Sequence, residues 1–202
     1  ADTHEKILVS ERLNYHSSPA VRTGAAHALS EAGIGVADLA HVDLYSCFSS
    51  AVEIAADVIG LAHDDPRGLT LTGGLPYFGG PGNNFGFVFA NGGYLTQHSF
   101  GVWCTTPRPF TRTDPASYQR TIDAMESPPL VERPDGPGTI ETFTVIHDAG
   151  MPRFALLIGR TPEGYRFLAQ LHEGAEALID VPVIGRPIHV HPTDTINRAT
   201  LA

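Results

Sequence analysis

The sequence has few charged residues and no excess of positive ones. Charged side chains make up 17% of the 202 residues, and 22 acidic against 13 basic residues leave a formal net charge of −9. An acidic chain repels phosphate groups, so neither nucleic acid nor anionic lipid is an expected partner. Coenzyme A is also an anion, so binding it would require a local basic or amide-lined site.

Cysteines and long apolar runs are also scarce. Cys47 and Cys104 are too few for a disulfide framework, and their spacing is not that of a zinc site, so we expect no metal. No apolar run reaches the ~18 residues of a membrane span. The polar N-terminus lacks a signal-peptide pattern. Together these absences predict a protein of the reducing cytoplasm that does not span a membrane.

Glycine and proline are abundant instead, with 21 and 16 residues, as in chains with many turns. In the first half, a helix is predicted to start near Ser17-Ser18-Pro19 and to end at Gly33, and a second helix is predicted from Ser49 or Ser50 to Gly60. Strands are predicted at 41–46, 69–72, 87–90 and 100–104. Helices alternating with strands predict an α/β layered domain.

The pattern changes near Pro107. Residues 106–138 form a proline-rich connection with one short predicted helix at 115–125. Only strands follow it, at 139–147, 153–160, 165–172 and 187–191. Short, evenly spaced strands separated by glycine and proline predict a small β-barrel. We therefore predict two domains, residues 1–106 and residues 107–202.

Three short motifs stand at strand ends or turns of the first half, where catalytic groups gather in open α/β sheets. They are Tyr45-Ser46-Cys47-Phe48, Gly79-Gly80-Pro81-Gly82 and Asn91-Gly92-Gly93. The two glycine-rich motifs are also ordinary turn sequences, so the order of all three carries the information. In that order and spacing they resemble the C-terminal half of the thiolase superfamily.

Two further stretches, 16–20 and 73–84, resemble the thiolase-like protein type 1 branch of that superfamily. The likeness covers about residues 1–106. The later strands resemble an OB-like domain that is appended to, or partnered with, some of these proteins. The resemblance implies a thiolase-like layered half-domain followed by an additional OB-like barrel.

The resemblance also implies roles for four positions, which we take as candidate substrate-binding residues. Tyr45 stands where thiolases have an Asn or His that holds a catalytic water or an oxyanion. Gly80 replaces the histidine of the Gly-His-Pro motif, which activates the nucleophile. Asn91 replaces the cysteine of the Cys-x-Gly motif, which shuttles a proton, and Gly93 keeps its glycine.

These replacements remove ordinary thiolase chemistry. A Claisen condensation needs a base near neutral pKa to take a proton from the acyl carbon, and the amide of Asn91 cannot serve. Gly80 has no side chain to donate to an oxyanion, and one such donor contributes about 2.7–4 kcal/mol of transition-state stabilisation. Asn91 can still donate a hydrogen bond to a thioester oxygen, so binding is expected to survive where catalysis does not.

Other polar residues have both a functional and an ordinary interpretation. Tyr45 and Tyr77 fit paired acid/base phenols, or half-buried tyrosines with hydrogen-bonded tips. His98 offers a replacement for the lost base, but it lies outside the matched motifs, so we expect it in an exposed loop. His189 and His191 share one strand face but have no evident third metal ligand.

Parts of a thiolase are missing from this chain. Thiolases have a helix between the second and third motifs, whereas here only Asn83-Asn84-Phe85 separates Gly82 from Gly86, so we expect residues to be absent there. The N-terminal half, which carries the nucleophile and the dimer edge, is also absent. We therefore expect a fragment whose partners are that half, or a full-length mate, in a homodimer.

The resemblance implies an acyl-CoA-handling protein of the acetyl-CoA acetyltransferase family, acting in lipid or acyl-CoA metabolism. The expected substrate or ligand is a coenzyme A thioester, without a further cofactor. Two alternatives stay open. One is a retro-aldolase on a CoA thioester that uses Tyr45 and Tyr77, and the other is a non-enzymatic acyl-CoA-binding or assembly module.

Overall fold

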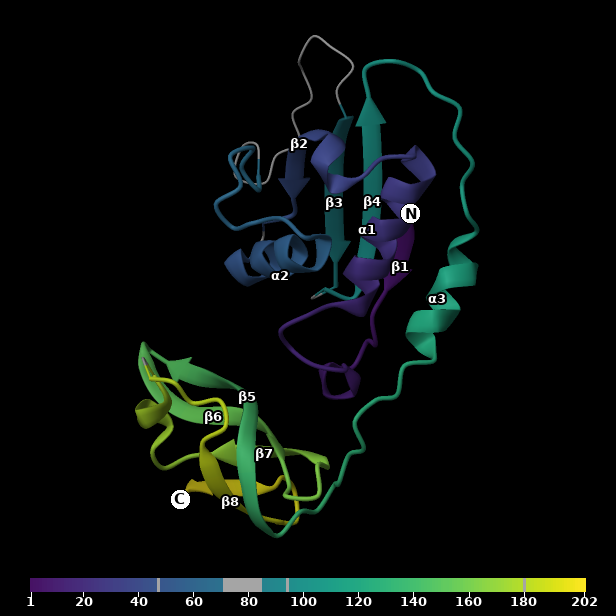
Figure 1. Ribbon diagram of the computed structural model, residues 1–202. Coiled ribbons are helices and arrows are strands. Elements are labelled where there is room, and N and C mark those ends of the chain that lie inside the picture. The colour runs from purple at the N-terminus through teal and green to yellow at the C-terminus, as the bar shows by residue number, and fades with distance from the viewer. Residues whose placement is uncertain (47, 71–84, 94, 180) are drawn as a thin grey trace. The chain divides into compact units, whose positions relative to one another are not determined.

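The chain forms two compact units, each with its own core. The computed structural model describes residues 1–46, 48–70, 85–93, 95–179 and 181–202 (Figure 1). The first unit comprises Ala1–Ile7 and Asn14–Glu126, and the second comprises Leu8–Leu13 and Ser127–Ala202. The predicted combination of an α/β half-domain and a following β-barrel is confirmed.

A four-stranded mixed sheet forms the centre of the first unit. Its strands are β1 (Asp2–His4), β2 (Leu39–Leu44), β3 (Phe85–Gly92) and β4 (Gln97–Cys104). Their order across the sheet is β1-β4-β3-β2. β2 runs parallel to β3, whereas β4 is antiparallel to both of its neighbours. The predicted β3–β4 hairpin is confirmed, but the three residues of β1 were not predicted.

Two helices, α1 (Pro19–Ala32) and α2 (Ser49–Ile59), cover one face of this sheet (Figure 1). The Ser18 hydroxyl accepts a hydrogen bond from Val21 N at the start of α1, and Gly33 ends the helix with φ 67°, both as predicted. α2 starts without a side-chain cap, because Phe48 and not a serine occupies its cap position. The shared core consists of apolar residues from both helices and from strands β2, β3 and β4.

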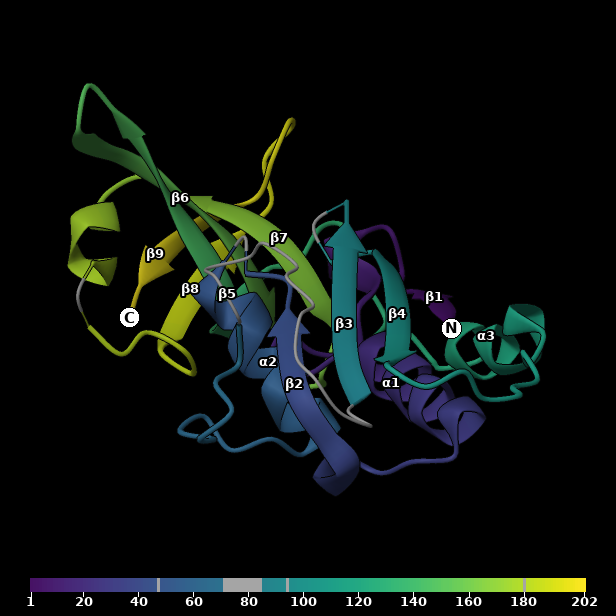
Figure 2. The same ribbon diagram turned by 90° about the horizontal axis from the view of Figure 1, so that it is seen from above.

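A third helix, α3 (Pro115–Asp123), lies beside β1 at one edge of the sheet (Figure 2). Asp2 N donates to the Tyr118 hydroxyl at 3.0 Å, and His4 N donates to Gln119 Oε1 at 2.9 Å. Gln119 Nε2 in turn donates to His4 O at 2.9 Å. Residues 107–126 thus belong with the first unit, whereas the sequence placed the change of domain near Pro107.

The second unit is a closed five-stranded barrel. Its strands are β5 (Gly136–Asp148), β6 (Met151–Arg160), β7 (Arg166–Leu171), β8 (Pro187–His191) and β9 (Arg198–Leu201). They close in the order β5-β6-β7-β9-β8, with β5 pairing β8. Phe167 is fully buried in the barrel core, and its ring lies over Gly138 and Gly159. The strand β9 was not predicted from the sequence.

Short 3-10 helices complete both units. They are η1 (Val9–Glu11), η2 (Val36–Asp38) and η3 (Ala175–Leu178). η1 lies within residues 8–13, which pack with the barrel although they are distant from it in sequence. In the part of the chain that the structure describes, no helix has the length and hydropathy needed to cross a bilayer.

A buried ion pair ties residues 8–13 to the barrel. Arg166 is fully buried and donates from Nε and Nη2 to both carboxylate oxygens of Glu141, each at 2.7 Å. Its Nη1 donates to the backbone carbonyls of Ser10, at 2.9 Å, and Arg12. Arg160 adds a third donor to Glu141 at 2.8 Å. A single guanidinium therefore joins two strands of the barrel to a segment more than a hundred residues away.

The Glu141 carboxylate makes the barrel sensitive to acid. Burial acts to raise the pKa of Glu141, but the hydrogen bonds from Arg166 and Arg160 outweigh it and hold the pKa below its ordinary value. A carboxyl group with a lowered folded pKa stabilises the fold fully above its unfolded pKa, which is about 4.3 for glutamate. That contribution is lost as the pH falls through the lower folded value.

We therefore expect the denaturant midpoint of the barrel to fall as the pH is lowered from about 6 to 3. Glu141→Gln should show a smaller fall, and it should start from a lower midpoint at pH 7, because Arg166 then lacks its counter-charge. Urea unfolding at each pH measures both effects. Glu176→Gln, at an exposed position, serves as the control. Parallel pH profiles for Glu141→Gln and the unchanged chain would contradict the prediction.

Candidate functional site

The carboxyl ends of β2 and β3 lie at the same end of the sheet, because the two strands are parallel. Leu44, the last residue of β2, pairs with Phe89 of β3. Tyr45 follows directly after Leu44, and Asn91 lies two residues beyond Phe89. The register therefore brings two of the sequence candidates to one end of the sheet.

Tyr45 lies in the short connection between β2 and α2. Its side chain is half-exposed, at 38% of its surface. The strand ends just before it, and α2 begins four residues after it at Ser49. This is the strand–loop–helix position in which open α/β sheets present ligand-binding groups.

Asn91 has a buried donor without a hydrogen-bond partner. Alternation along β3 places it on the same face as Phe87 and Phe89, which is the face covered by α1 and α2. Within the described residues, its Nδ2 is buried and makes no hydrogen bond. Buried polar atoms are nearly always paired, so an amide donor in this state is a candidate for ligand binding.

His98 lies directly opposite Asn91 in the β3–β4 pairing. It is only 4% exposed, and its ring packs 5.6 Å from the Phe89 ring and 6.4 Å from the Phe100 ring. The expectation of an exposed-loop histidine was wrong, because β4 begins at Gln97 and carries His98 into the sheet. Histidine is the commonest general acid or base in enzymes, so an imidazole beside the Asn91 amide is chemically relevant.

Asn91 and His98 form a row of paired polar residues that extends across the sheet to Thr3 of β1. Thr3 pairs with His98 on the side of β4 opposite β3. Thr3 is buried, and its hydroxyl donates to Ala20 O at 2.8 Å. Close by in the sequence, the buried Glu5 accepts from the Ser18 hydroxyl at 2.7 Å and from Ala20 N at 3.0 Å. A carboxylate is favoured there by the positive end of the α1 dipole. This end of the sheet is thus polar, whereas its centre is lined by phenylalanine.

Gly93 is explained by the turn that it occupies. Its φ of 58° is one that side chains rarely adopt, and a Cβ there would lie 2.4 Å from Thr96 Oγ1. Thr96 N donates to Gly92 O at 3.1 Å and closes the turn between β3 and β4. The geometry gives Gly93 a structural role, and a role in substrate binding stays a prediction.

Two sequence candidates, Tyr77 and Gly80, lie outside the described residues. Among the residues that are described, no group of three or more His, Cys, Asp or Glu side chains is arranged to hold a metal. The histidine pair of the barrel does lie on one strand, with the rings of His189 and His191 4.4 Å apart. His191 Nδ1 contacts Asp135 Oδ1 at 3.1 Å, so this pair has a carboxylate neighbour.

A pocket of about 730 Å³ opens at the polar end of the sheet. Asn91, Gly92 and His98 line it on the hairpin side, and β1 and α3 line the other side. Its volume is within the range of about 300–1,000 Å³ that is typical of small-molecule sites. Asn91 Nδ2 is itself buried on the face that α1 and α2 cover, so the pocket lies beside this group. An amide donor and an imidazole at paired positions can bind a carbonyl oxygen and exchange a proton close to it. The sequence analysis set His98 aside because it lies outside the three motifs, and only strand pairing brings it opposite Asn91.

Comparison with known proteins identifies both parts of the chain. Residues 117–195 match the family model described as the thiolase-like protein type 1 additional C-terminal domain. The whole chain is similar, with 40% identity and a TM-score of 0.88, to the crystal structure of a monomeric SCP2-thiolase-like protein type 1 from Mycobacterium smegmatis. The match covers 100% of this chain and 49% of that one, so the chain spans about half the length of the structure it matches. A search among curated proteins finds no match.

Proposed function

We propose that this chain, which belongs to the thiolase superfamily as a thiolase-like protein of type 1, binds acyl-CoA thioesters without carrying out ordinary thiolase chemistry. The observation that supports this proposal is the buried, unpartnered Nδ2 of Asn91. A buried donor without a partner is unfavourable by about 1–3 kcal/mol, so a ligand that supplies an acceptor is stabilised there. A thioester carbonyl is such an acceptor. The role would lie in lipid or acyl-CoA metabolism.

The side chains at this site argue against carbon–carbon bond formation by the thiolase route. The amide at position 91 does not ionise near neutral pH and cannot shuttle a proton, whereas thiolases use a cysteine at the matching position. The described part of the site therefore offers a donor for the carbonyl oxygen but not the thiol that the family's condensation uses.

Burial of His98 beside Asn91 favours one second candidate, a retro-aldolase that acts on a CoA thioester side chain. In such a reaction, a base takes the proton of a β-hydroxyl group, the neighbouring carbon–carbon bond breaks, and the electron pair moves to the thioester as an enolate. His98 would take the proton, and Asn91 would donate to the enolate oxygen. Tyr45, at the end of β2, would be an additional acid/base group.

Isothermal titration with acetyl-CoA and with free CoA tests the main proposal. We expect acetyl-CoA to bind more tightly than CoA, and Asn91→Leu to weaken acetyl-CoA by about 2–10-fold, the value of one neutral hydrogen bond. Free CoA, which lacks the thioester carbonyl, is the matched control, and its binding should not change. Equal loss for both ligands, or none for acetyl-CoA, would contradict the role of Asn91.

A thiolysis assay with acetoacetyl-CoA separates the remaining possibilities. We expect negligible turnover, because neither position 80 nor position 91 has the group that thiolases use. Turnover at an ordinary enzymatic rate, about 1–10³ per second, would overturn the proposal. Binding without turnover on thiolysis or retro-aldol substrates would instead favour a non-enzymatic binding module.

We further propose that an N-terminal thiolase half packs on the open face of the sheet. Trp103 and Ala90 are exposed on the face turned away from α1 and α2, and Trp103 leaves 61% of its surface accessible. Exposed apolar surface of this kind is typical of an interaction site. A homodimer of the complete polypeptide stays a prediction, and the monomeric M. smegmatis protein lends it no support.

A further inference from the structure

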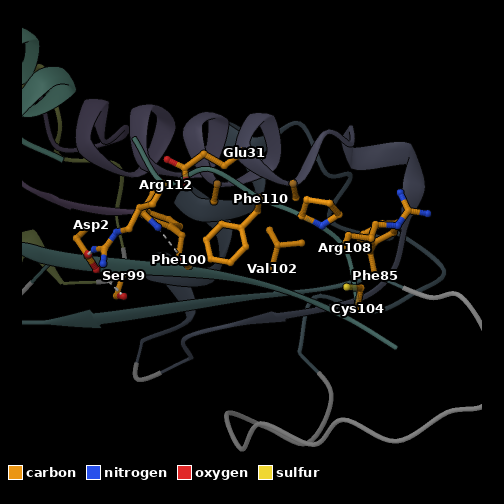
Figure 3. A pocket seen from close by; sticks show the side chains of 14 residues that line it. Asp2, Glu31, Phe85, Ser99, Phe100, Val102, Cys104, Arg108, Phe110 and Arg112 are labelled. Carbon is orange, nitrogen blue, oxygen red and sulfur yellow. Dashed lines mark hydrogen bonds and ion pairs between the residues drawn. The ribbon is translucent and has the colours of Figure 1, made fainter. Parts of the chain in front are cut away.

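A second pocket, of about 510 Å³, is lined by Phe85, the first residue of β3, whereas Asn91 lies near the other end of that strand. Figure 3 shows the side chains that line it. The strand residues Phe85, Phe100 and Val102 form its floor. Ala28 and Ala32 of α1 form one wall, and the segment that leads from β4 to α3 lies across it with Phe110. All of these residues belong to the first unit. The pocket's lining shares Asp2 and Ser99 with the pocket at the polar end of the sheet, but it includes neither Asn91 nor His98.

The segment above the pocket, residues 105–114, is held at both ends. Near α3, Arg112 forms an ion pair with Asp2, and Thr113 N donates to Glu31 Oε1 at 2.7 Å. Near β4, the Arg108 guanidinium lies 4.9 Å from the centre of the Phe85 ring. Between these two points, Phe110 lies between α1 and β4 (Figure 3). The segment that covers the pocket is thus anchored near both of its ends.

The two ends of the pocket differ in charge. At one end, Asp2 neutralises Arg112, and Glu31 lies close by. At the other end, Arg108 forms no ion pair with any carboxylate among the residues that the structure describes. The Phe85 ring orients its guanidinium while leaving the planar N–H donors available. One end of the pocket therefore offers a positioned cation suited to a carboxylate.

Between these ends the pocket is apolar and open to solvent. Phe110 leaves 73% of its surface accessible, and Val102 is half-buried. Phe110, Val102 and Phe85 together line the apolar part of the pocket, and contiguous exposed apolar surface often marks a ligand-binding groove. A hydrocarbon chain that covered Phe110 and Val102 would remove this apolar surface from water.

We propose that this pocket binds an amphipathic anion that has one unbranched hydrocarbon chain, namely a medium-chain carboxylate. The carboxylate pairs with Arg108, and the chain lies along Val102 beneath Phe110. The volume is within the range of small-molecule sites, about 300–1,000 Å³. This site goes beyond the proposed acyl-CoA role, because it lies at the other end of β3 and uses none of the residues assigned to that role.

Calorimetric titration with octanoate tests the proposal. Octanol lacks the charge, octylamine reverses it, and acetate lacks the chain, so each should bind at least about tenfold more weakly than octanoate. Arg108→Gln should weaken octanoate about tenfold or more, the value of a charge-assisted hydrogen bond. Arg22→Gln, at an exposed position of α1 away from the pocket, should change nothing. Ala32→Leu, which fills the pocket, should also weaken octanoate.

A second measurement uses Cys104, an exposed thiol in the pocket lining. Octanoate should slow its alkylation by iodoacetamide, read by peptide mass spectrometry, and acetate should not. Asn91→Leu should leave octanoate binding unchanged, so failure of this proposal is distinct from failure of the acyl-CoA proposal. No binding of octanoate to the unchanged chain, equal binding of octanol, or full binding by Arg108→Gln would each overturn the proposal.

Discussion

Replacing Arg166 with methionine is expected to destabilise the barrel by about 3–5 kcal/mol. The guanidinium is fully buried and supplies two charge-assisted hydrogen bonds to Glu141. Methionine restores most of the volume but leaves the Glu141 carboxylate, which is 16% exposed, without its main partner. An uncompensated buried charge is among the most destabilising changes that one substitution can cause.

The same change should also release residues 8–13, because Arg166 donates to the carbonyls of Ser10 and Arg12. Native-state hydrogen exchange of the β5, β6 and β7 amides measures the loss of barrel stability, and faster exchange at residues 8–13 reports the release. Arg160→Met is the matched control: Arg160 bonds to the same carboxylate but is 34% exposed, so a loss of only about 1 kcal/mol is expected. Similar losses of stability for Arg166→Met and Arg160→Met would show that the burial of Arg166 does not explain its contribution to barrel stability.

Gly159→Ala is expected to destabilise the barrel by about 1–3 kcal/mol. A Cβ at this position would lie 2.4 Å from the Phe167 ring and 2.9 Å from Thr139 O, so both the ring and the paired strand would have to move. Gly138 contacts the same ring, and a Cβ there would lie 2.8 Å from it. Overpacking of a full core is therefore the reason for the loss.

A double-mutant cycle with Phe167→Leu checks this cause, since the smaller side chain should recover part of the loss in the Gly159→Ala background. Chemical unfolding provides the free energies. Gly35→Ala is the control, because a Cβ there would meet its nearest neighbour at an ordinary 3.7 Å and φ is −107°. Additive effects of the two barrel substitutions would mean that ring contact does not explain the destabilisation.

The elements predicted correctly from the sequence are those with local signals. Ser18 and Gly33 mark the ends of α1 because a cap and a left-handed residue act within one helical turn. The barrel was predicted from β-branched strands separated by glycine and proline. By contrast, β1 has only three residues and β9 only four, so neither had a pattern of sufficient length.

The parts that escaped prediction depend on contacts between distant residues. Nothing near Arg166 in the sequence indicates that it is fully buried, because its partners Glu141 and Ser10 are 25 and 156 residues away. His98 was misplaced for the same reason, since its position opposite Asn91 follows from strand pairing. In the candidate site, the motifs predicted Asn91 and Tyr45, while pairing across the sheet added the imidazole.

The contact of α3 with β1 limits how copies of this sheet can join. The Tyr118 hydroxyl bonds to Asp2 N, and the Gln119 amide bonds to both N and O of His4. An incoming strand would need these backbone groups for its own hydrogen bonds. Strand addition must therefore take place away from this edge. A sheet that is closed on one side can join one other sheet, but it cannot propagate into a fibre. α3 thus covers the β1 edge, so that two molecules can still join through their other edges but a continuous sheet of many copies cannot form along this edge.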